Sequence, residues 1–168
     1  MATRVRPIAD FFYSRYILGT LRITFSSARS HRMTIILADA DVHFRDRLKK
    51  RLEKITGVNV VGVSSDSEEA TAMILNRKPE VAILNSSLPD GLGIEVLRQI
   101  KRLMVPPTII VVTDDPSRDN KTAWSLAGAD YIFDKATEDH KMIDTVRLLC
   151  VPHSQIEALG SSIAMLDH

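Results

Sequence analysis

The sequence contains a single cysteine, Cys150, among its 168 residues. One thiol can form no intramolecular disulfide and no cysteine-based metal cluster, so a reducing, cytoplasmic location is expected. No uninterrupted apolar run approaches the ~20 residues that a helix needs to cross a bilayer, although apolar residues make up 45% of the chain, which is typical of a globular protein. The composition therefore predicts a globular domain without membrane insertion.

Acidic residues are almost absent from the first 32 positions. This segment holds six arginines and one acid, Asp10, so 16 of the 22 basic and 20 of the 21 acidic residues lie beyond it. The net charge of +1 thus combines a basic leader with a mildly acidic body. An acidic body argues against a nucleic-acid-binding domain, and no nucleic-acid partner is expected.

The leader, residues 1–32, has three possible interpretations. It could be a basic amphipathic segment for targeting or for a membrane surface, an N-terminal helix that docks on the body, or upstream sequence read through to a true start at Met33. Arginines interrupt every candidate hydrophobic stretch, so a cleaved secretory signal is not expected. The chain then divides into the leader, a domain at 33–150 and a C-terminal tail at 151–168.

From Met33 onward, short β-branched apolar runs alternate with amphipathic stretches, which is typical of repeated βα units. The expected strands are residues 34–38, 58–63, 81–84, 108–112 and 131–133. The expected helices are residues 42–56, a segment from Ser65 or Asp66 to before Pro79, a segment from about Leu92 to Pro106, a segment from Asp115 or Ser117 to Gly128, and a last helix that ends near Cys150. This order predicts an α/β three-layer sandwich, flavodoxin-like, with a five-stranded parallel sheet of strand order 2-1-3-4-5.

The apolar positions of each helix predict which side chains face the sheet, because they recur at spacings of three and four residues. The residues expected to point inward are Phe44, Leu48, Leu52, Ile55, Ala70, Met73, Ile74, Ile94, Leu97, Ile100, Met104, Ile143, Val146, Leu149 and Cys150. Trp124 is expected to be half-buried on the fourth helix.

Polar residues follow four of the five expected strands. Asp39 follows the first strand, Asn85 the third, Thr113 the fourth and Lys135 the fifth. Ligands bind at the carboxyl ends of the strands in an open parallel sheet. An acid, an amide, a hydroxyl and an amine are therefore expected to converge on one site.

The segment around Asn85 resembles a known phosphorylation loop. Asn85 runs directly into Ser86-Ser87-Leu88-Pro89-Asp90-Gly91-Leu92-Gly93, and the run Gly128-Ala129-Asp130-Tyr131-Ile132-Phe133-Asp134-Lys135 is close to that of stand-alone receivers. On these motifs, residues 34 to about 150 resemble the response-regulator receiver domain of two-component signal transduction.

The resemblance implies a specific chemistry. In that family an acidic pair after the first strand and an aspartate after the third strand bind Mg²⁺, and the latter aspartate accepts a phosphoryl group. Asp39 matches the first acid, Thr113 the switch hydroxyl and Lys135 the amine that contacts the phosphoryl group. Tyr131 matches the aromatic residue whose rotamer reports the state of that hydroxyl.

Two departures from the family pattern fall on the catalytic positions. Ala40 stands at the second acid, and Asn85 stands at the phosphoacceptor. A carboxamide lacks the anionic oxygen that acts as nucleophile, so no catalytic residue and no enzyme activity are expected. Mg²⁺ prefers carboxylate oxygens. Only Asp39 and the backbone carbonyl of Ser87 remain as weak ligands, so no cofactor is expected beyond weakly bound Mg²⁺.

Neighbouring residues are poor substitutes for the missing groups. Asp41 is expected to cap the following helix, with a lesser chance of replacing the lost metal ligand. Ser86 is expected to point away from the site, and Asp90 is expected in a turn. Without a phosphoryl group, Lys135 is expected to form an ion pair with Asp39.

These features favour a single-domain, response-regulator-like protein that binds a partner protein independently of phosphorylation, a pseudo-receiver. The expected partner is a histidine kinase or a downstream signalling protein, bound through a face at about 117–149 that includes Tyr131. The alternative is a functional phosphorelay receiver that uses Mg²⁺ and a non-standard acceptor. Residues 151–168 are too few for a helix-turn-helix, so no DNA-binding output is expected within this sequence, and Asp39-Ala40-Asp41 would repel the phosphate of a flavin.

Overall fold

The computed structural model describes residues 32–89 and 93–151. The strands are β1 (Met33–Ala38), β2 (Val58–Ser64), β3 (Val81–Asn85), β4 (Thr108–Thr113) and β5 (Tyr131–Asp134). The helices are α2 (Val42–Leu52), α3 (Ser67–Arg77), α4 (Gly93–Lys101), α5 (Arg118–Ala127) and α6 (Asp139–Leu149). The leader and the tail lie almost wholly outside the described residues, so their boundaries stay predictions.

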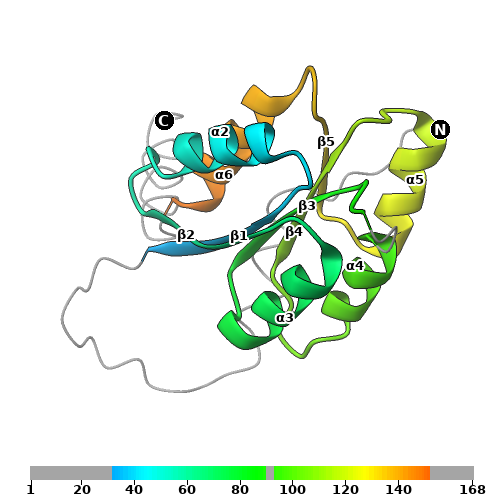
Figure 1. Ribbon diagram of the computed structural model, residues 1–168, viewed down its shortest axis with the longest axis horizontal. Helices are drawn as coiled ribbons and strands as arrows, with labels where there is room; N and C mark the ends of the chain where they lie inside the picture. The colour runs from blue at the N-terminus through cyan, green and yellow to red at the C-terminus, as the bar shows by residue number, and fades with distance from the viewer. Residues whose placement is uncertain (1–31, 90–92, 152–168) are drawn as a thin grey trace, which may run out of the picture. The chain divides into compact units, whose positions relative to one another are not determined.

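The five strands form one parallel sheet with the order β2-β1-β3-β4-β5, which confirms the predicted topology. Figure 1 shows α2 and α6 on one side of this sheet and α3 and α4 on the other. Every residue of β3 and β4 is buried, as expected for central strands that helices cover on both faces. The carboxyl ends of β1, β3, β4 and β5 therefore meet along a single edge.

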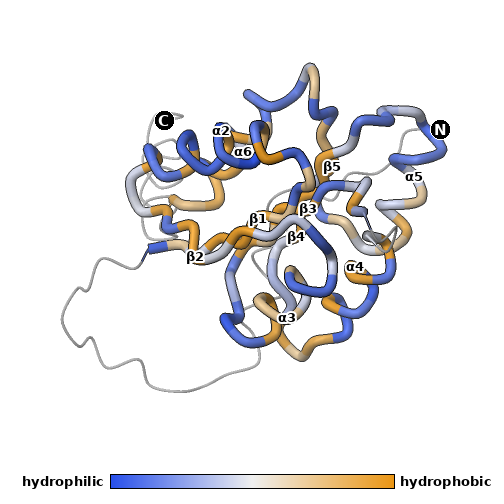
Figure 2. Tube along the Cα trace, in the orientation of Figure 1, coloured by the Kyte–Doolittle hydropathy of each residue, from blue (hydrophilic) through white to orange (hydrophobic). Residues whose placement is uncertain are grey.

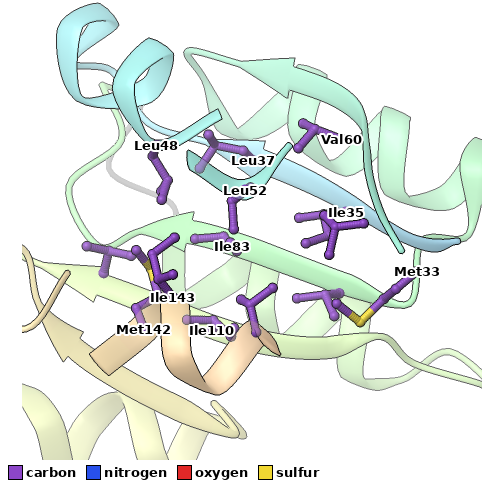
Figure 3. Packing of buried hydrophobic residues seen from close by; sticks show 14 of the residues in the cluster. Met33, Ile35, Leu37, Leu48, Leu52, Val60, Ile83, Ile110, Met142 and Ile143 are labelled. Carbon is purple, nitrogen blue, oxygen red and sulfur yellow. The ribbon is translucent and has the colours of Figure 1, made fainter. Parts of the chain in front are cut away.

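Alternation along the strands divides the interior into two hydrophobic clusters. Ile35 and Leu37 of β1 pack toward α2 and α6, whereas Ile36 and Ala38 pack toward α3, α4 and α5. Figure 3 shows the first cluster, in which Leu48 and Leu52 of α2 meet side chains of the sheet. Figure 2 shows the complementary pattern, with hydrophobic strands inside and hydrophilic helix faces outside. Each such buried side chain contributes about 1.5–3 kcal/mol to stability.

Side-chain caps begin three of the helices and place them against the sheet. Asp41 accepts hydrogen bonds from the backbone N–H groups of His43 and Phe44 at the start of α2, as predicted. Asp66 caps α3, and Ser117 caps α5. Gly128 ends α5 with a φ of 108°, a left-handed conformation that glycine adopts without strain.

Three packing predictions need correction. α2 ends at Leu52 rather than at residue 56, because the N–H groups of Lys54 and Ile55 bond to carbonyls three residues back and form a turn. Met104 is 99% exposed instead of buried, since α4 ends at Lys101. Trp124 is fully buried rather than half-buried.

The partly buried apolar residues also refine the predicted core. Met73, Ile94, Leu149, Cys150 and Ile55 pack against the two clusters but are partly buried. Val96 and Met142 are buried although the helical spacing had not singled them out. Within residues 32–89 and 93–151, no helix is both long enough and apolar enough to cross a bilayer.

Candidate functional site

Four strand ends bring the predicted polar residues to one edge of the sheet. Asp39 directly follows β1, Asn85 ends β3, Thr113 ends β4 and Lys135 follows β5. Asp39, Asn85 and Thr113 are buried. The parallel pairing of β1 with β3, β3 with β4 and β4 with β5 fixes this convergence.

Lys135 and Asp39 form the central ion pair of the site. The Lys135 Nζ lies 3.0 Å from Oδ1 of Asp39, whose side chain is 1% exposed. The same ammonium lies 4.5 Å from the centroid of the Phe44 ring, in cation–π geometry, and 3.9 Å from Oδ2 of Asp41. The ion pair expected from the sequence is therefore present, and the lysine charge is balanced within the protein.

Asp39 is held by further bonds from the chain. Its Oδ1 also accepts a hydrogen bond of 2.8 Å from the backbone N–H of Asp41. The Arg45 Nη1 donates to the backbone carbonyl of Asp39 at 2.7 Å. In contrast, Oδ2 of Asp39 is buried and has no hydrogen-bond partner among the described residues.

The oxygen atoms at the site can be compared with those that Mg²⁺ requires. A buried carboxylate oxygen without a donor is compatible with a cation, but Mg²⁺ demands nearly octahedral oxygen coordination. Ala40 offers no side-chain oxygen, and the Asn85 Oδ1 accepts the N–H of Ser87 at 2.9 Å. No group of three or more His, Cys, Asp or Glu residues in the described part of the chain could hold a metal ion. This donor set does not fit the three-carboxylate magnesium site of the family pattern.

Thr113 lies at the centre of a buried hydrogen-bond network. Its Oγ1 accepts bonds from Ser86 Oγ at 3.0 Å, from the backbone N–H of Asp115 at 3.1 Å and from Asn120 Nδ2 at 3.2 Å. The Thr113 hydroxyl donates to the carbonyl of Asp115, which also accepts from Asn120 Nδ2. The network joins the ends of β3 and β4 to the first turn of α5.

Two members of this network were not recognised in the sequence. Ser86 was expected to point away from the site, but β3 ends at Asn85, so strand alternation does not govern its side chain. Asn120 lies three residues beyond the Ser117 cap, and its position in the first turn of a helix after a strand-end hydroxyl was the available signal.

Tyr131 does not lie beside Thr113, contrary to the role that the resemblance implied. Tyr131 packs against the first hydrophobic cluster, the one beside α2 and α6 that contains Ile35 and Leu37. Its ring stacks on that of Phe133 with a centroid separation of 6.4 Å. Thr113 instead bonds to Asn120 of α5, and the β5 residue on that side of the sheet is Ile132. Successive strand residues point to opposite faces. Burial, and secondly the nearby Asp130 carboxylate, raise the pKa of the Tyr131 phenol.

The carboxylates of Asp134 and Glu138 stabilise the loop that contains Lys135 through hydrogen bonds. Asp134 Oδ1 accepts bonds from the N–H groups of the two residues after Lys135. Glu138 Oε1 accepts from Lys141 Nζ at 2.9 Å, and its Oε2 accepts from the N–H of Asp134 at 3.0 Å and lies 3.6 Å from Lys121 Nζ. These contacts, led by the Lys141 bond, lower the pKa of Glu138 to about 2.

The remaining predicted residues play lesser roles. Ser87 is exposed and donates its N–H to Asn85. Asp41 is half-exposed, and hydrogen bonding from the N–H of Phe44 is the main cause that lowers the pKa of its carboxyl group. The turn expected at Asp90 lies outside the described residues.

Comparison with known proteins is consistent with this geometry. The family model for the response regulator receiver domain matches residues 35–147. The phosphate regulon transcriptional regulatory protein PhoB of Pseudomonas aeruginosa is 30% identical over 112 residues, which cover 66% of this chain and 48% of that protein. The sensory transduction protein LytT of Bacillus anthracis is 25% identical over 115 residues, 68% of this chain and 46% of LytT. The chain spans about half the length of these relatives.

Solved structures share the fold. The receiver domain of NarL from Mycobacterium tuberculosis superposes with a TM-score of 0.66 at 20% identity, over 71% of this chain and 97% of that one. A CheY-like receiver domain protein from Methanospirillum hungatei gives a TM-score of 0.62 at 25% identity, over 71% and 94%. From the family match over residues 35–147 and this shared fold, the chain belongs to the response-regulator receiver domains of two-component systems.

Proposed function

We propose that this receiver domain is a pseudo-receiver, a protein-binding module that works without phosphorylation. The observation that carries the proposal is Asn85, a buried carboxamide at the end of β3. Its Oδ1 accepts a hydrogen bond from Ser87, and it provides no anionic oxygen to attack phosphorus. The paired Lys135 and Asp39 support the same conclusion, because the lysine charge already has a carboxylate partner.

The Thr113 network supports a domain that is held in one conformation. The Thr113 hydroxyl bonds to Ser86, Asp115 and Asn120, and the residue is 0% exposed. A phosphoryl group that recruited this hydroxyl would have to displace the bonds from Ser86 and Asn120. Since ligands shift conformations only through differential affinity, partner binding is the proposed input in place of phosphate.

The partner is proposed to be a histidine kinase or a downstream signalling protein. Its binding face is the surface of α5, β5 and α6, at about 117–149. This surface includes two large exposed apolar side chains, Leu126 at 84% and Leu148 at 60%. Exposed apolar groups of this size are available to the core of a protein interface.

A titration with Mg²⁺ and beryllofluoride, a phosphoryl mimic, tests the proposal. Amide NMR shifts and Trp124 fluorescence are followed in the native protein and in the Asn85→Asp/Ala40→Asp double variant. Trp124 is a suitable reporter because its ring contacts Gly93, which begins α4 just after the loop that follows Asn85. We expect the double variant to respond and the native protein to stay unchanged at millimolar Mg²⁺.

One observation favours the alternative, a phosphorelay receiver that uses Mg²⁺ and a non-standard acceptor. The buried Oδ2 of Asp39 has no hydrogen-bond donor in the described part of the chain. A carboxylate oxygen without a donor is able to coordinate a cation. The same titration decides between the two functions. A native protein that responds with shifts at Thr113 and Lys135 would establish the alternative and end the pseudo-receiver proposal.

A further inference from the structure

We propose that the pocket between α2 and α6 binds an acidic segment of a partner protein. This pocket, of about 420 Å³, is lined by Arg51, Lys54, His140, Ile143, Asp144 and Arg147. Its residues belong to α2, the turn that follows it and α6, two helices that lie on the same side of the sheet (Figure 1). None of these residues is Asp39, Asn85, Thr113 or Lys135, the residues at the strand ends. The inference rests on the proposed function, since both assign protein binding to α6, and it adds the chemistry of the partner.

The cations of the pocket exceed the carboxylates available to them. Arg51 is paired with Asp139, and Arg147 is paired with Asp144 at 2.6 Å. Lys54 forms no ion pair with any described residue. It is exposed, so its ammonium is available to a carboxylate from outside.

The basic character extends along the last turn of α2. Lys49, Lys50 and Arg51 follow one another there, and of these Lys49 is paired with Glu53. A surface on which positive charges outnumber negative ones raises the local concentration of oppositely charged partners and speeds their association. The surface is therefore complementary to a segment that carries several carboxylates.

One lining residue of the pocket is apolar, which favours a peptide over a free anion. This residue is Ile143, which is 4% exposed. A segment with carboxylates on both sides of an apolar residue would place that residue against Ile143 and its acids near Lys54 and His140. A free phosphate would use the cations alone.

The helix ends also disfavour a compact phosphate ligand. Phosphates bind at helix N-termini, where backbone N–H groups and the dipole attract negative charge. Lys54 instead follows the C-terminal end of α2, and the first turn of α6 already holds the Asp139 carboxylate.

Fluorescence anisotropy with a labelled, end-blocked peptide of alternating glutamate and leucine tests the inference on the full chain. The matched control peptide carries glutamine in place of glutamate. We expect the acidic peptide to bind, with amide NMR shifts at residues 51–54 and 140–147, and to weaken as added salt screens the charges. Lys54→Glu should lower the affinity by about fivefold or more.

Lys78→Glu is the matched control variant, because Lys78 is an exposed lysine at the end of α3, away from the pocket and from the basic turn of α2. It should change the affinity by less than about twofold. The inference is overturned if the acidic peptide does not bind, if both charge reversals weaken binding equally, if the glutamine peptide binds as well, or if inorganic phosphate displaces the acidic peptide from these residues. Each of these results leaves the proposed function intact, because the beryllofluoride titration tests that function separately.

Discussion

The two halves of the strand-end site differ in what they keep of the receiver pattern. At β1 and β3, Asp39 remains, but Ala40 and Asn85 stand where the pattern has carboxylates. At β4 and β5, the hydroxyl of Thr113 and the amine of Lys135 are both present. The residues of the second half also form bonds that need no phosphoryl group. Lys135 forms an ion pair with Asp39, and Thr113 of β4 accepts a hydrogen bond from Asn120 of α5. Structural bonds therefore give the hydroxyl and the amine a role that does not depend on a phosphoryl group.

Of the substitutions that test this comparison, the removal of Lys135 should lower the stability of the protein most. Lys135→Met leaves the Asp39 carboxylate buried without its partner, and we expect the free energy of unfolding to fall by about 2 kcal/mol, less than for a fully buried pair because Lys135 keeps some exposure. Urea denaturation measures the loss. The Asp39→Asn/Lys135→Met double variant should recover much of it, and a single variant as stable as the native protein would show that Asp39 does not depend on the lysine.

Removing the Thr113 hydroxyl should lower the free energy of unfolding by a somewhat smaller amount. Thr113→Val keeps the side-chain shape but removes the partner of the Ser86 hydroxyl and of the Asp115 backbone N–H, so we expect a loss of about 1.5 kcal/mol. Asn120 and the Asp115 carbonyl keep their bond to each other. Hydrogen exchange should also rise at the start of α5. Thr113→Ser retains the hydroxyl and serves as the control. If valine costs no more stability than serine, the bonds of the hydroxyl contribute nothing measurable to the stability of the domain.

The smallest effect is expected at the loop that carries Lys135. Glu138→Gln removes a carboxylate whose pKa lies near 2 instead of the usual 4.5. A lowered pKa in the folded state stabilises the protein above pH 4.5, and this contribution disappears as the pH falls toward 2. We expect the native protein to exceed the variant by about 0.5 kcal/mol at neutral pH, a surface-pair value, and the two to converge in acid. Thermal unfolding at several pH values measures this, and a difference that persists in acid would contradict it.

The sequence predicted the sheet well because its signals are local. Short apolar runs predicted β3 and β4 to within one residue, and the cap at Asp41 was identified from its side chain. For α5 the sequence offered Asp115 or Ser117, and the structure shows that Ser117 is the cap. The prediction that Met104 is buried was wrong because the helical spacing was extended past the end of α4 at Lys101.

The sequence predicted most of the residues that form the site, but not all of the contacts between them. Asp39 and Lys135 are separated by 96 positions and were paired correctly, since strand ends in a parallel sheet converge. Tyr131 was assigned to Thr113 by motif, yet strand alternation places the two side chains on different faces of the sheet. Asn120 was missed because its contact with Thr113 depends on how α5 packs.

The sequence by itself determined the alternation of strands and helices and the carboxamide at Asn85. These follow from side-chain periodicity and from covalent chemistry, which need no tertiary contact. Only the tertiary structure decided that the Thr113 hydroxyl bonds to Ser86 and Asn120, and that the cations of α2 meet α6 in a pocket. Hydrogen bonds and ion pairs depend on distances of a few ångströms, and packing sets such distances between residues far apart in the chain.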